Sequence, residues 1–192
     1  MIPVERHPLE PFLPANARLL MLGSFPPQRK RWSMEFYYPN LQNDMWRIFG
    51  WIFFGDKAHF LTANGKAFDK ERLVAFLQQK GIALFDAATS VRRLQDNASD
   101  KYLEVVEPTH IPSLLRQLPQ CRAIVTTGQK STDTLREQLN AAEPPVGARV
   151  SFHCEGREFW LYRMPSSSRA YPKPIDEKAV YYRKMFYDLA LL

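Results

Sequence analysis

The sequence has little cysteine and no long apolar run. Its two cysteines, Cys121 and Cys154, lack metal-ligand spacing, and nothing in the chain suggests secretion, so a reduced cytoplasmic protein is expected. The longest apolar run, Ile48 to Phe54, is interrupted by Gly50 and is far too short to span a membrane. The first eleven residues carry charge and three prolines where a signal peptide needs an apolar core. We therefore expect no membrane partner.

Other familiar signatures are missing as well. The chain shows no repeat at a period of about 20 to 50 residues, and it has neither GxxxxGK[ST] nor GxGxxG for binding phosphates. Its four histidines are dispersed, so no metal site and no cofactor are expected. No linker divides the 192 residues. We expect one monomeric domain over 1–192, with residues 1–16 wrapping its surface.

Positive charge and aromatic side chains are plentiful. Lys and Arg number 26 against 20 Asp and Glu, which gives a net charge of +6. The chain also has 13 Phe, 8 Tyr and 4 Trp. Basic residues interleaved with aromatics are typical of proteins that stack on nucleic-acid bases, although an ordinary basic enzyme fits the charge equally well.

Hydrophobic periodicity predicts alternating strands and helices. Short apolar runs predict strands over 18–22, 82–85 and 123–125, a hairpin over 150–162, and polar loops over 24–40 and 86–107. Helical spacing predicts helices that include 41–52, 73–77, 111–118, 135–139 and 175–189. This alternation favours a mostly parallel sheet covered on both faces, which binds ligands at the carboxyl ends of its strands.

The segments after the predicted strands are chemically distinctive. Gly23-Ser24-Phe25-Pro26-Pro27 permits a tight turn and close approach of a ligand, although a plain strand-ending turn explains it too. Basic residues beside Trp32 come next, and the aromatic and carboxamide-rich stretch 36–46 follows. Such side chains can stack on a base and hydrogen-bond its edges. The loop 166–168 supplies hydroxyls suited to phosphates.

These residues resemble a known superfamily. The pattern G-S-F-P, then Y-Y, then N-x-M-W resembles motif I of the uracil-DNA glycosylase superfamily, most closely in its hypoxanthine-DNA glycosylase branch. Residues 161–170 resemble the second motif of that branch, and 81–86 and 125–128 resemble its intervening strand ends. The resemblance implies a three-layer α/β/α sandwich with a short, mostly parallel sheet. It also implies an enzyme that flips a damaged base out of DNA and hydrolyses its N-glycosidic bond.

The resemblance also implies roles for individual residues. Asn43 matches the Asn that orients water, and Tyr38 matches an aromatic that stacks on the flipped base. Ser24 stands where relatives often have Asn or Asp, and Asn40 stands where this branch has His, which puts substrate choice in doubt. The candidate catalytic residues are Asn43 and Ser24; the candidate base-binding residues are Phe25, Tyr38, Asn40 and Asp86; the candidate DNA-binding residues are Arg29, Lys30, Arg31, Ser166, Ser167, Ser168, Arg169 and Lys173.

Two other functions remain open at this point. A non-catalytic nucleic-acid-binding protein could keep the fold and lose the chemistry, as Ser24 and the altered residues before Asn43 suggest. A small-molecule or nucleotide hydrolase of the α/β class is the second alternative. DNA that carries one damaged base discriminates among the three.

Overall fold

Five strands form the central sheet of the computed structural model, which describes residues 1–97 and 99–192. Their spatial order is β3 (Ile82–Asp86), β2 (Leu19–Gly23), β6 (Ala123–Thr126), β8 (Arg157–Arg163) and β7 (Arg149–Cys154). The first four strands are parallel, and only β7 pairs antiparallel, with β8. All five residues of β2 and of β3 are buried, as expected for parallel strands covered on both faces.

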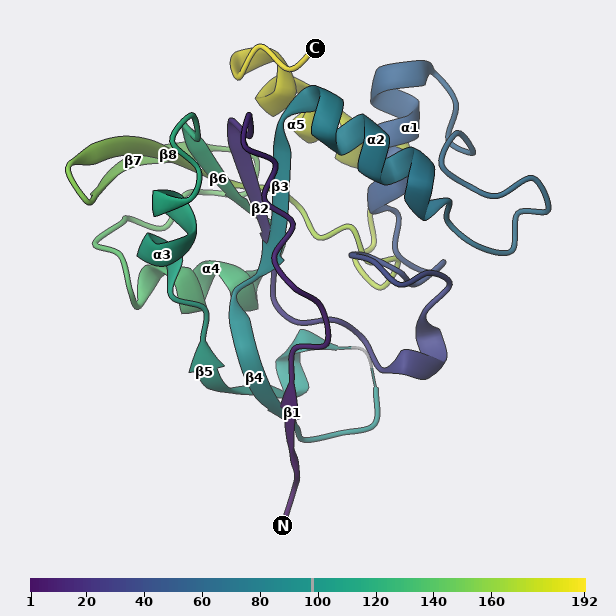
Figure 1. The fold of residues 1–192 in the computed structure, drawn as a ribbon. Coiled ribbons are helices and arrows are strands. Elements are labelled where there is room, and N and C mark those ends of the chain that lie inside the picture. Colours follow the sequence, from purple (N-terminus) through teal and green to yellow (C-terminus); the bar gives the residue numbers. More distant parts are fainter. Residues whose placement is uncertain (98) are drawn as a thin grey trace.

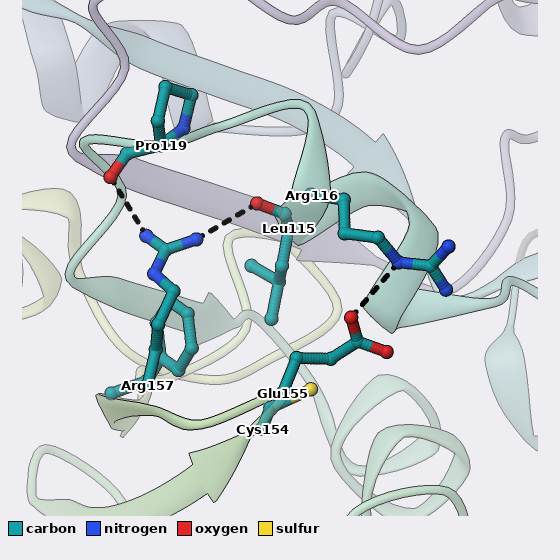
Figure 2. Close-up of a pocket in the computed structure, with 7 residues that line it drawn as sticks. Leu115, Arg116, Pro119, Cys154, Glu155 and Arg157 are labelled. Atoms are coloured by element: carbon teal, nitrogen blue, oxygen red, sulfur yellow. Dashed lines mark hydrogen bonds and ion pairs between the residues drawn. The ribbon is translucent and has the colours of Figure 1, made fainter.

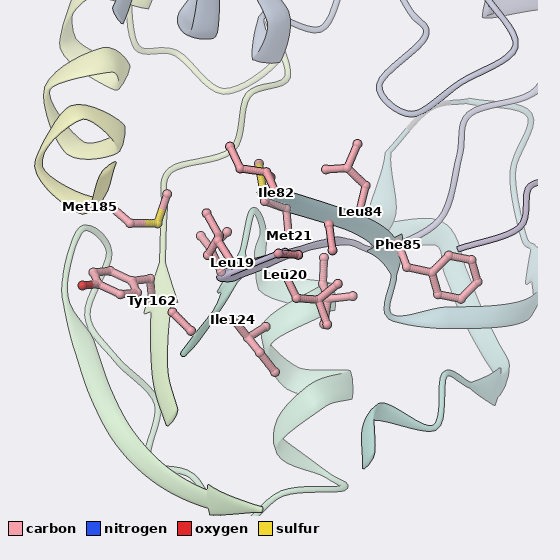
Figure 3. Close-up of a cluster of buried hydrophobic side chains, with 14 of the residues drawn as sticks. Leu19, Leu20, Met21, Ile82, Leu84, Phe85, Ile124, Tyr162 and Met185 are labelled. Atoms are coloured by element: carbon pink, nitrogen blue, oxygen red, sulfur yellow. The ribbon is translucent and has the colours of Figure 1, made fainter. Parts of the chain in front are cut away.

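Helices cover both faces of this sheet (Figure 1). The helices α1 (Met45–Phe54), α2 (Lys70–Lys80) and α5 (Ile175–Asp188) lie on one side, and α3 (Ile111–Arg116) and α4 (Gln129–Arg136) lie on the other. The core is a continuous apolar cluster that includes strand residues such as Leu19 and Ile124 and the α5 residue Met185 (Figure 3). This confirms the predicted three-layer arrangement.

Local sequence explains where several elements end. Asp69 accepts a hydrogen bond from Arg72 N–H and so caps α2, and Gly81 ends it in the left-handed conformation. The hairpin between β7 and β8 turns at Glu155 and Gly156, which both have positive φ. One boundary differs from the prediction: the first helix begins at Met45 rather than near Leu41, because residues 40–43 form a hydrogen-bonded turn.

The predicted loop over 86–107 is wrong, because half of it belongs to a second sheet. There β4 (Ala88–Arg93) lies between β1 (Val4–Arg6) and β5 (Leu103–Pro108), and both pairings are antiparallel. A small 3-10 helix, η2 (Asp100–Tyr102), precedes β5. A satellite apolar cluster of Ala88, Val91 and Leu103 supports this sheet, and Phe25 packs against it.

The N-terminal segment 1–16 does more than wrap the surface. It supplies β1, and farther along Phe12 forms an isolated antiparallel bridge with Leu84 of β3. Between these two contacts, His7 N–H donates to the carbonyl of Thr89. The segment therefore connects the small sheet to the edge of the central one.

Candidate functional site

The register of the parallel strands gathers their carboxyl ends at one edge. Gly23 of β2 lies opposite Asp86 of β3, and Leu22 lies opposite Thr126 of β6. Thr126 in turn lies opposite Arg163 of β8. Because of this register, the loops after β2, β3, β6 and β8 all leave the sheet at the same edge, where a ligand of such a sheet is expected to bind.

Gly23 leaves room for two polar side chains at this edge. A Cβ placed on Gly23 would lie 2.6 Å from Asp86 Oδ1 and 3.4 Å from the Tyr38 hydroxyl oxygen. The Tyr38 hydroxyl is within hydrogen-bond distance of Thr127 Oγ1, at 3.1 Å, and its ring meets Trp46 edge-on at 5.7 Å between centroids. A residue other than glycine at position 23 would therefore displace this cluster.

Tyr38 adopts a backbone conformation that is unusual for its type. Its φ is +49°, in the left-handed region, which costs a bulky residue about 1–3 kcal/mol. Burial, together with the charge of Asp86, raises the pKa of its hydroxyl, so this group stays protonated and can donate a hydrogen bond. The ring predicted to stack on a base thus lies at the sheet edge in a conformation held by its surroundings.

His7 is a site residue that the sequence interpretation missed. Its side chain and that of Asp86 are only 4% and 9% exposed, and Nε2 lies 2.7 Å from Asp86 Oδ2. Rings of Phe25, Phe85 and Tyr37 surround the imidazole at centroid distances of 5.3, 4.7 and 6.1 Å. No local sequence signal could reveal this pair, because 79 residues separate the two side chains.

Ser24 and Phe25 follow Gly23 directly. Within the described part of the chain, the backbone N–H groups of both residues have no hydrogen-bond acceptor. The Ser24 side chain lies near the carboxyl group of Asp100, a second acidic residue that the sequence interpretation did not single out. Burial raises the pKa of Asp100. Among the described residues, the turn after β2 therefore has two backbone N–H groups without an acceptor, and they lie near the half-buried carboxyl group of Asp100.

The loops after β2 and β8 are joined by backbone contacts. Asn43 forms an isolated antiparallel bridge with Ser168, and Asp44 N–H donates to the Ser167 carbonyl oxygen at 2.8 Å. Arg169 N–H donates to the Gln42 carbonyl oxygen at 3.0 Å. We call this region, residues 42–44 with 167–169, the loop junction. It brings together the two segments that the motif resemblance singled out.

The carboxamides at the loop junction have local partners. Asn43 Oδ1 accepts from Met45 N–H at 3.0 Å, at the start of α1, while its Nδ2 has no protein partner among the described residues. Asn40 Oδ1 accepts from Gln42 N–H at 3.0 Å, which shapes the turn. The side-chain NH2 group of Asn43 can therefore donate to a ligand or a water molecule, whereas Asn40 stabilises the turn through its bond from Gln42 N–H.

Beneath the loop junction lies a cluster of charges that we call the Asp44 cluster: Asp44, Arg47, Arg169 and Lys178. The buried Asp44 carboxylate receives Arg169 Nε at 3.0 Å and lies 3.4 Å from an Arg47 nitrogen. The Lys178 ammonium donates to the Ser168 carbonyl oxygen at 2.9 Å, and burial lowers its pKa. With three cations and one carboxylate, the cluster places excess positive charge under the serine loop.

Of the other predicted DNA-binding cations, those of η1 are exposed and Lys173 is half-buried. Arg29, Lys30 and Arg31 form the 3-10 helix η1 (Arg29–Arg31), where Arg29 pairs with Glu35 and Lys30 pairs with Asp96. Arg29 also lies over the Trp32 ring, 4.3 Å from its centroid. Lys173 pairs with Glu177 on α5 at 3.4 Å. These are surface ion pairs, which contribute about 0–1 kcal/mol each and exchange readily.

A cavity of about 280 Å³ lies elsewhere, beside the turn between β7 and β8 (Figure 2). There Arg157 donates to the carbonyl oxygens of Leu115 and Pro119, and Arg116 pairs with Glu155 at 3.1 Å. Because β8 begins at Arg157, this cavity is at the opposite end of that strand from the predicted site. Its polar groups already have protein partners and hold α3 in place.

The described residues contain neither a cluster of metal-ligand side chains nor a helix that could span a membrane. Among residues 1–97 and 99–192, no group of three or more His, Cys, Asp or Glu side chains could hold a metal ion. In the same part of the chain, every helix falls short of the length and apolar character needed to cross a bilayer.

The sequence matches no family model and no curated protein. Among solved structures, the fold is similar to the solution NMR structure of a protein from Methanosarcina acetivorans described as a "putative Uracil DNA glycosylase". The TM-score is 0.64 at 20% sequence identity, and the match covers 97% of this chain and 99% of the other. The chain thus has a mixed α/β fold like that of this protein along nearly its whole length.

Proposed function

We propose that this protein is a DNA glycosylase that flips a deaminated base out of DNA and hydrolyses its N-glycosidic bond. The observation that carries the proposal is the loop junction, where the segment bearing Asn43 meets the Ser166–Ser168 loop at the carboxyl edge of the sheet. Two motifs resembling those of the superfamily come together there, on a fold similar to that of the protein described as a "putative Uracil DNA glycosylase".

The turn after β2 is suited to stabilise the leaving base. As the bond between C1′ and the base nitrogen breaks, its electron pair goes to the base, which leaves with negative charge. The free N–H groups of Ser24 and Phe25 can donate to that charge, and preorganised donors of this kind lower the barrier strongly. The protonated hydroxyl of Tyr38 adds a donor, and its ring provides a surface for stacking.

Asn43 is the proposed residue that orients the attacking water. Its Nδ2 is available, and its Oδ1 has a second lone pair besides the one used for Met45 N–H. The water oxygen forms a bond to C1′ and releases a proton to the departing base or to solvent, so the bond is hydrolysed without a covalent intermediate. An oxocarbenium-like transition state needs a positioned water more than a strong base.

Phosphates of the strand are proposed to bind at the Ser166–Ser168 loop. Ser167 is buried, but the Ser166 and Ser168 hydroxyls, which accept from the N–H groups of Ser168 and Ala170, can still donate to phosphate oxygens. The Asp44 cluster supplies positive charge beside them. The exposed cations of η1 and Lys173 extend this positive surface. The substrate is thus DNA, with hypoxanthine and uracil as the bases to test first.

The experiment is a panel of end-labelled duplexes and single strands that carry one hypoxanthine, uracil, xanthine or mismatched thymine. Alkali-sensitive strand breaks at the modified position would report an abasic product and support the proposal. Tight binding without product would favour a non-catalytic nucleic-acid-binding protein, in which Asn43 serves only the start of α1. Neither product nor binding would favour a small-molecule hydrolase and would overturn the proposal.

A further inference from the structure

The two outer strands of the central sheet differ in what lies beside them. Part of the outer edge of β3 is occupied by Phe12, which exchanges backbone hydrogen bonds with Leu84. The other outer strand, β7, pairs with β8 on one side and lies at the margin of the described chain (Figure 1). The sheet therefore has one edge that is partly covered and one that is open.

The hydrogen bonds around β7 show which of its backbone groups are open. Arg163 N–H donates to the Ala148 carbonyl oxygen at 3.1 Å, just before β7 begins. Because bonded and non-bonded positions alternate along an antiparallel pair, every second residue from Ala148 onward bonds to β8. The intervening residues direct their N–H and carbonyl groups away from β8, and no partner for these groups is present among the described residues: Arg149, Ser151 and His153.

The strand β7 lacks the features that usually prevent the addition of another strand. Natural outer strands are commonly short, bulged, covered, or interrupted by proline. The six residues of β7 pair with β8 in one unbroken register and include no proline. The cation at its beginning, Arg149, lies over the Trp160 ring of β8, 4.0 Å from its centroid, rather than over the open edge. This edge is therefore suited to receive a strand.

Antiparallel pairing of β7 with a second copy of itself would use every open backbone group. With a two-fold axis at Ser151, this residue faces itself and Arg149 faces His153 of the second copy, and each such pair exchanges two N–H···O bonds. A register shifted by two residues would leave some of these groups unpaired. Half-buried Val150 would also oppose Phe152 of the second copy, a β-branched and aromatic pair of the kind that stabilises sheets.

The exposed face of the same hairpin carries complementary charges. Arg149 and Glu158 are exposed, and among residues 1–97 and 99–192 neither belongs to an ion pair. Glu158 lies opposite His153, so in the self-paired register about 10 Å, or two strand spacings, separates its backbone from that of Arg149 in the second copy. Two long side chains span this distance. In the single chain the guanidinium donates to the Tyr162 hydroxyl at 2.7 Å, and a carboxylate is the stronger acceptor.

We propose that two copies of this chain associate through β7, which joins their central sheets into one continuous sheet. The occupant is a second copy because a single register satisfies the open backbone groups, brings Arg149 to Glu158 and opposes Val150 to Phe152. The dimer replaces the monomer expected from the sequence, and it does not depend on the proposed function. Because the strands of the second copy run the other way, the two candidate sites open in opposite directions.

The first test is sedimentation velocity on the full chain. Pairing along one strand buries less area than a standard interface, so the expected dissociation constant is about 10–100 µM, and a monomer–dimer equilibrium should appear across that range. Ser151→Pro removes an N–H that points away from β8 and should raise the dissociation constant at least about tenfold. Ser151→Ala keeps this N–H and is the matched control, which should associate as wild type does.

Two further sets of variants test the register. Arg149→Glu and Glu158→Arg should each weaken association several-fold, and their combination should restore it, because unlike charges then oppose each other again. Ser151→Cys should form a disulfide-linked dimer under a mild oxidant, since the Cα atoms of a self-opposed bonded pair lie about 5.5 Å apart. His153→Cys does not face itself and is the control, and the native cysteines are buried.

The outcomes separate this dimer from other forms of association. Wild type that stays monomeric throughout the concentration range would overturn the proposal, whatever segment of another protein might bind β7 instead. A dimer that Ser151→Pro leaves unchanged would also overturn it, because another surface would then hold the copies together. Thermal unfolding establishes that each variant is folded. If Ser151→Pro does not fold, equal cross-linking of Ser151→Cys and His153→Cys is the result that contradicts the register.

Discussion

The loop junction and the helix η1 offer positive charge in opposite ways. At the loop junction, Arg169 and Lys178 are held by a buried carboxylate and a backbone carbonyl, with more cations than anions. On η1, Arg29 and Lys30 are exposed and each has its own carboxylate. Cations that are fixed by buried partners therefore lie beside the proposed catalytic residue Asn43. The exposed cations of η1 are instead paired with carboxylates, which a DNA phosphate must displace.

The largest expected effect is a loss of cleavage activity when Asn43 of the loop junction is replaced. Asn43→Ala should lower single-turnover cleavage by on the order of 10²-fold, about 2.7 kcal/mol of barrier, and leave DNA affinity and its salt dependence unchanged. Removal of the bond to Met45 N–H costs about 1 kcal/mol of stability. Asn43→Asp is the control for that bond, because its carboxylate still accepts from Met45. Undiminished cleavage by a folded Asn43→Ala protein would remove Asn43 from the mechanism.

A second change removes the buried ammonium of the Asp44 cluster. Lys178→Met should weaken DNA binding by about tenfold and reduce the salt slope by about one, because one charge beneath the serine loop is lost. Its thermal stability should stay the same or rise, since burial already lowers the pKa of Lys178 and thus opposes the charged form. Salt titrations of binding and thermal unfolding measure the two effects. Binding equal to wild type would show that the cluster is purely structural.

Substitutions at the exposed cations of η1 should change DNA binding and its salt dependence. The double variant Arg29→Ala with Lys30→Ala should weaken binding to damaged and undamaged duplex about equally and flatten the salt slope by about one or two. Conversely, Glu35→Gln with Asp96→Asn should strengthen binding several-fold at low salt, because the two cations lose their competitors. Stability should change by less than about 1 kcal/mol in both. A slope equal to that of wild type would mean that η1 does not contact DNA.

The smallest effect on DNA binding is expected for Asp100, where the predicted change is in the stability of the protein. Burial raises the folded-state pKa of Asp100 above its value in the unfolded chain, so ionisation above that pKa destabilises the protein. Asp100→Asn should therefore raise the melting temperature at pH 7, because the amide is never ionised. Thermal unfolding from pH 7 downward should show this gain shrink as the pH falls through the folded pKa toward the unfolded one, where wild type is protonated in both states. Lys130 and Arg93 lie near enough to favour the ionised form, so both stay unchanged in this test. A gain that is the same at every pH would contradict the assignment to Asp100.

The sequence predicted those parts of the fold that have a local signal. Continuous apolar runs marked β2, β3 and β6, and the period of Ala179, Tyr182 and Phe186 marked α5. The small sheet was not predicted because β4 and β5 carry polar or charged residues on both sides of short apolar patches, such as Val105 and Val106 between Glu104 and Glu107. Its antiparallel pairings, moreover, connect segments without a short turn.

The candidate site was predictable to the extent that it follows strand ends. Gly23 and Asp86 each end an apolar run, so their meeting at one edge follows from a parallel sheet. The contacts of Asp44 with Arg169 and of His7 with Asp86 span 125 and 79 residues, and only the folded chain brings them together. Asp100 could be identified only once the second sheet was known to bring its loop back to Ser24.

The bridge between Phe12 and Leu84 has a consequence for solubility. Because β3 is an outer strand of the central sheet, its unpaired backbone groups could recruit strands from other molecules. Phe12 and Leu84 exchange two backbone hydrogen bonds, of 3.0 and 2.9 Å, that occupy part of this edge. The same stretch of chain carries His7. Loss of residues 1–16 would therefore uncover an aggregation-prone edge and remove the contact of His7 with Asp86 in a single step.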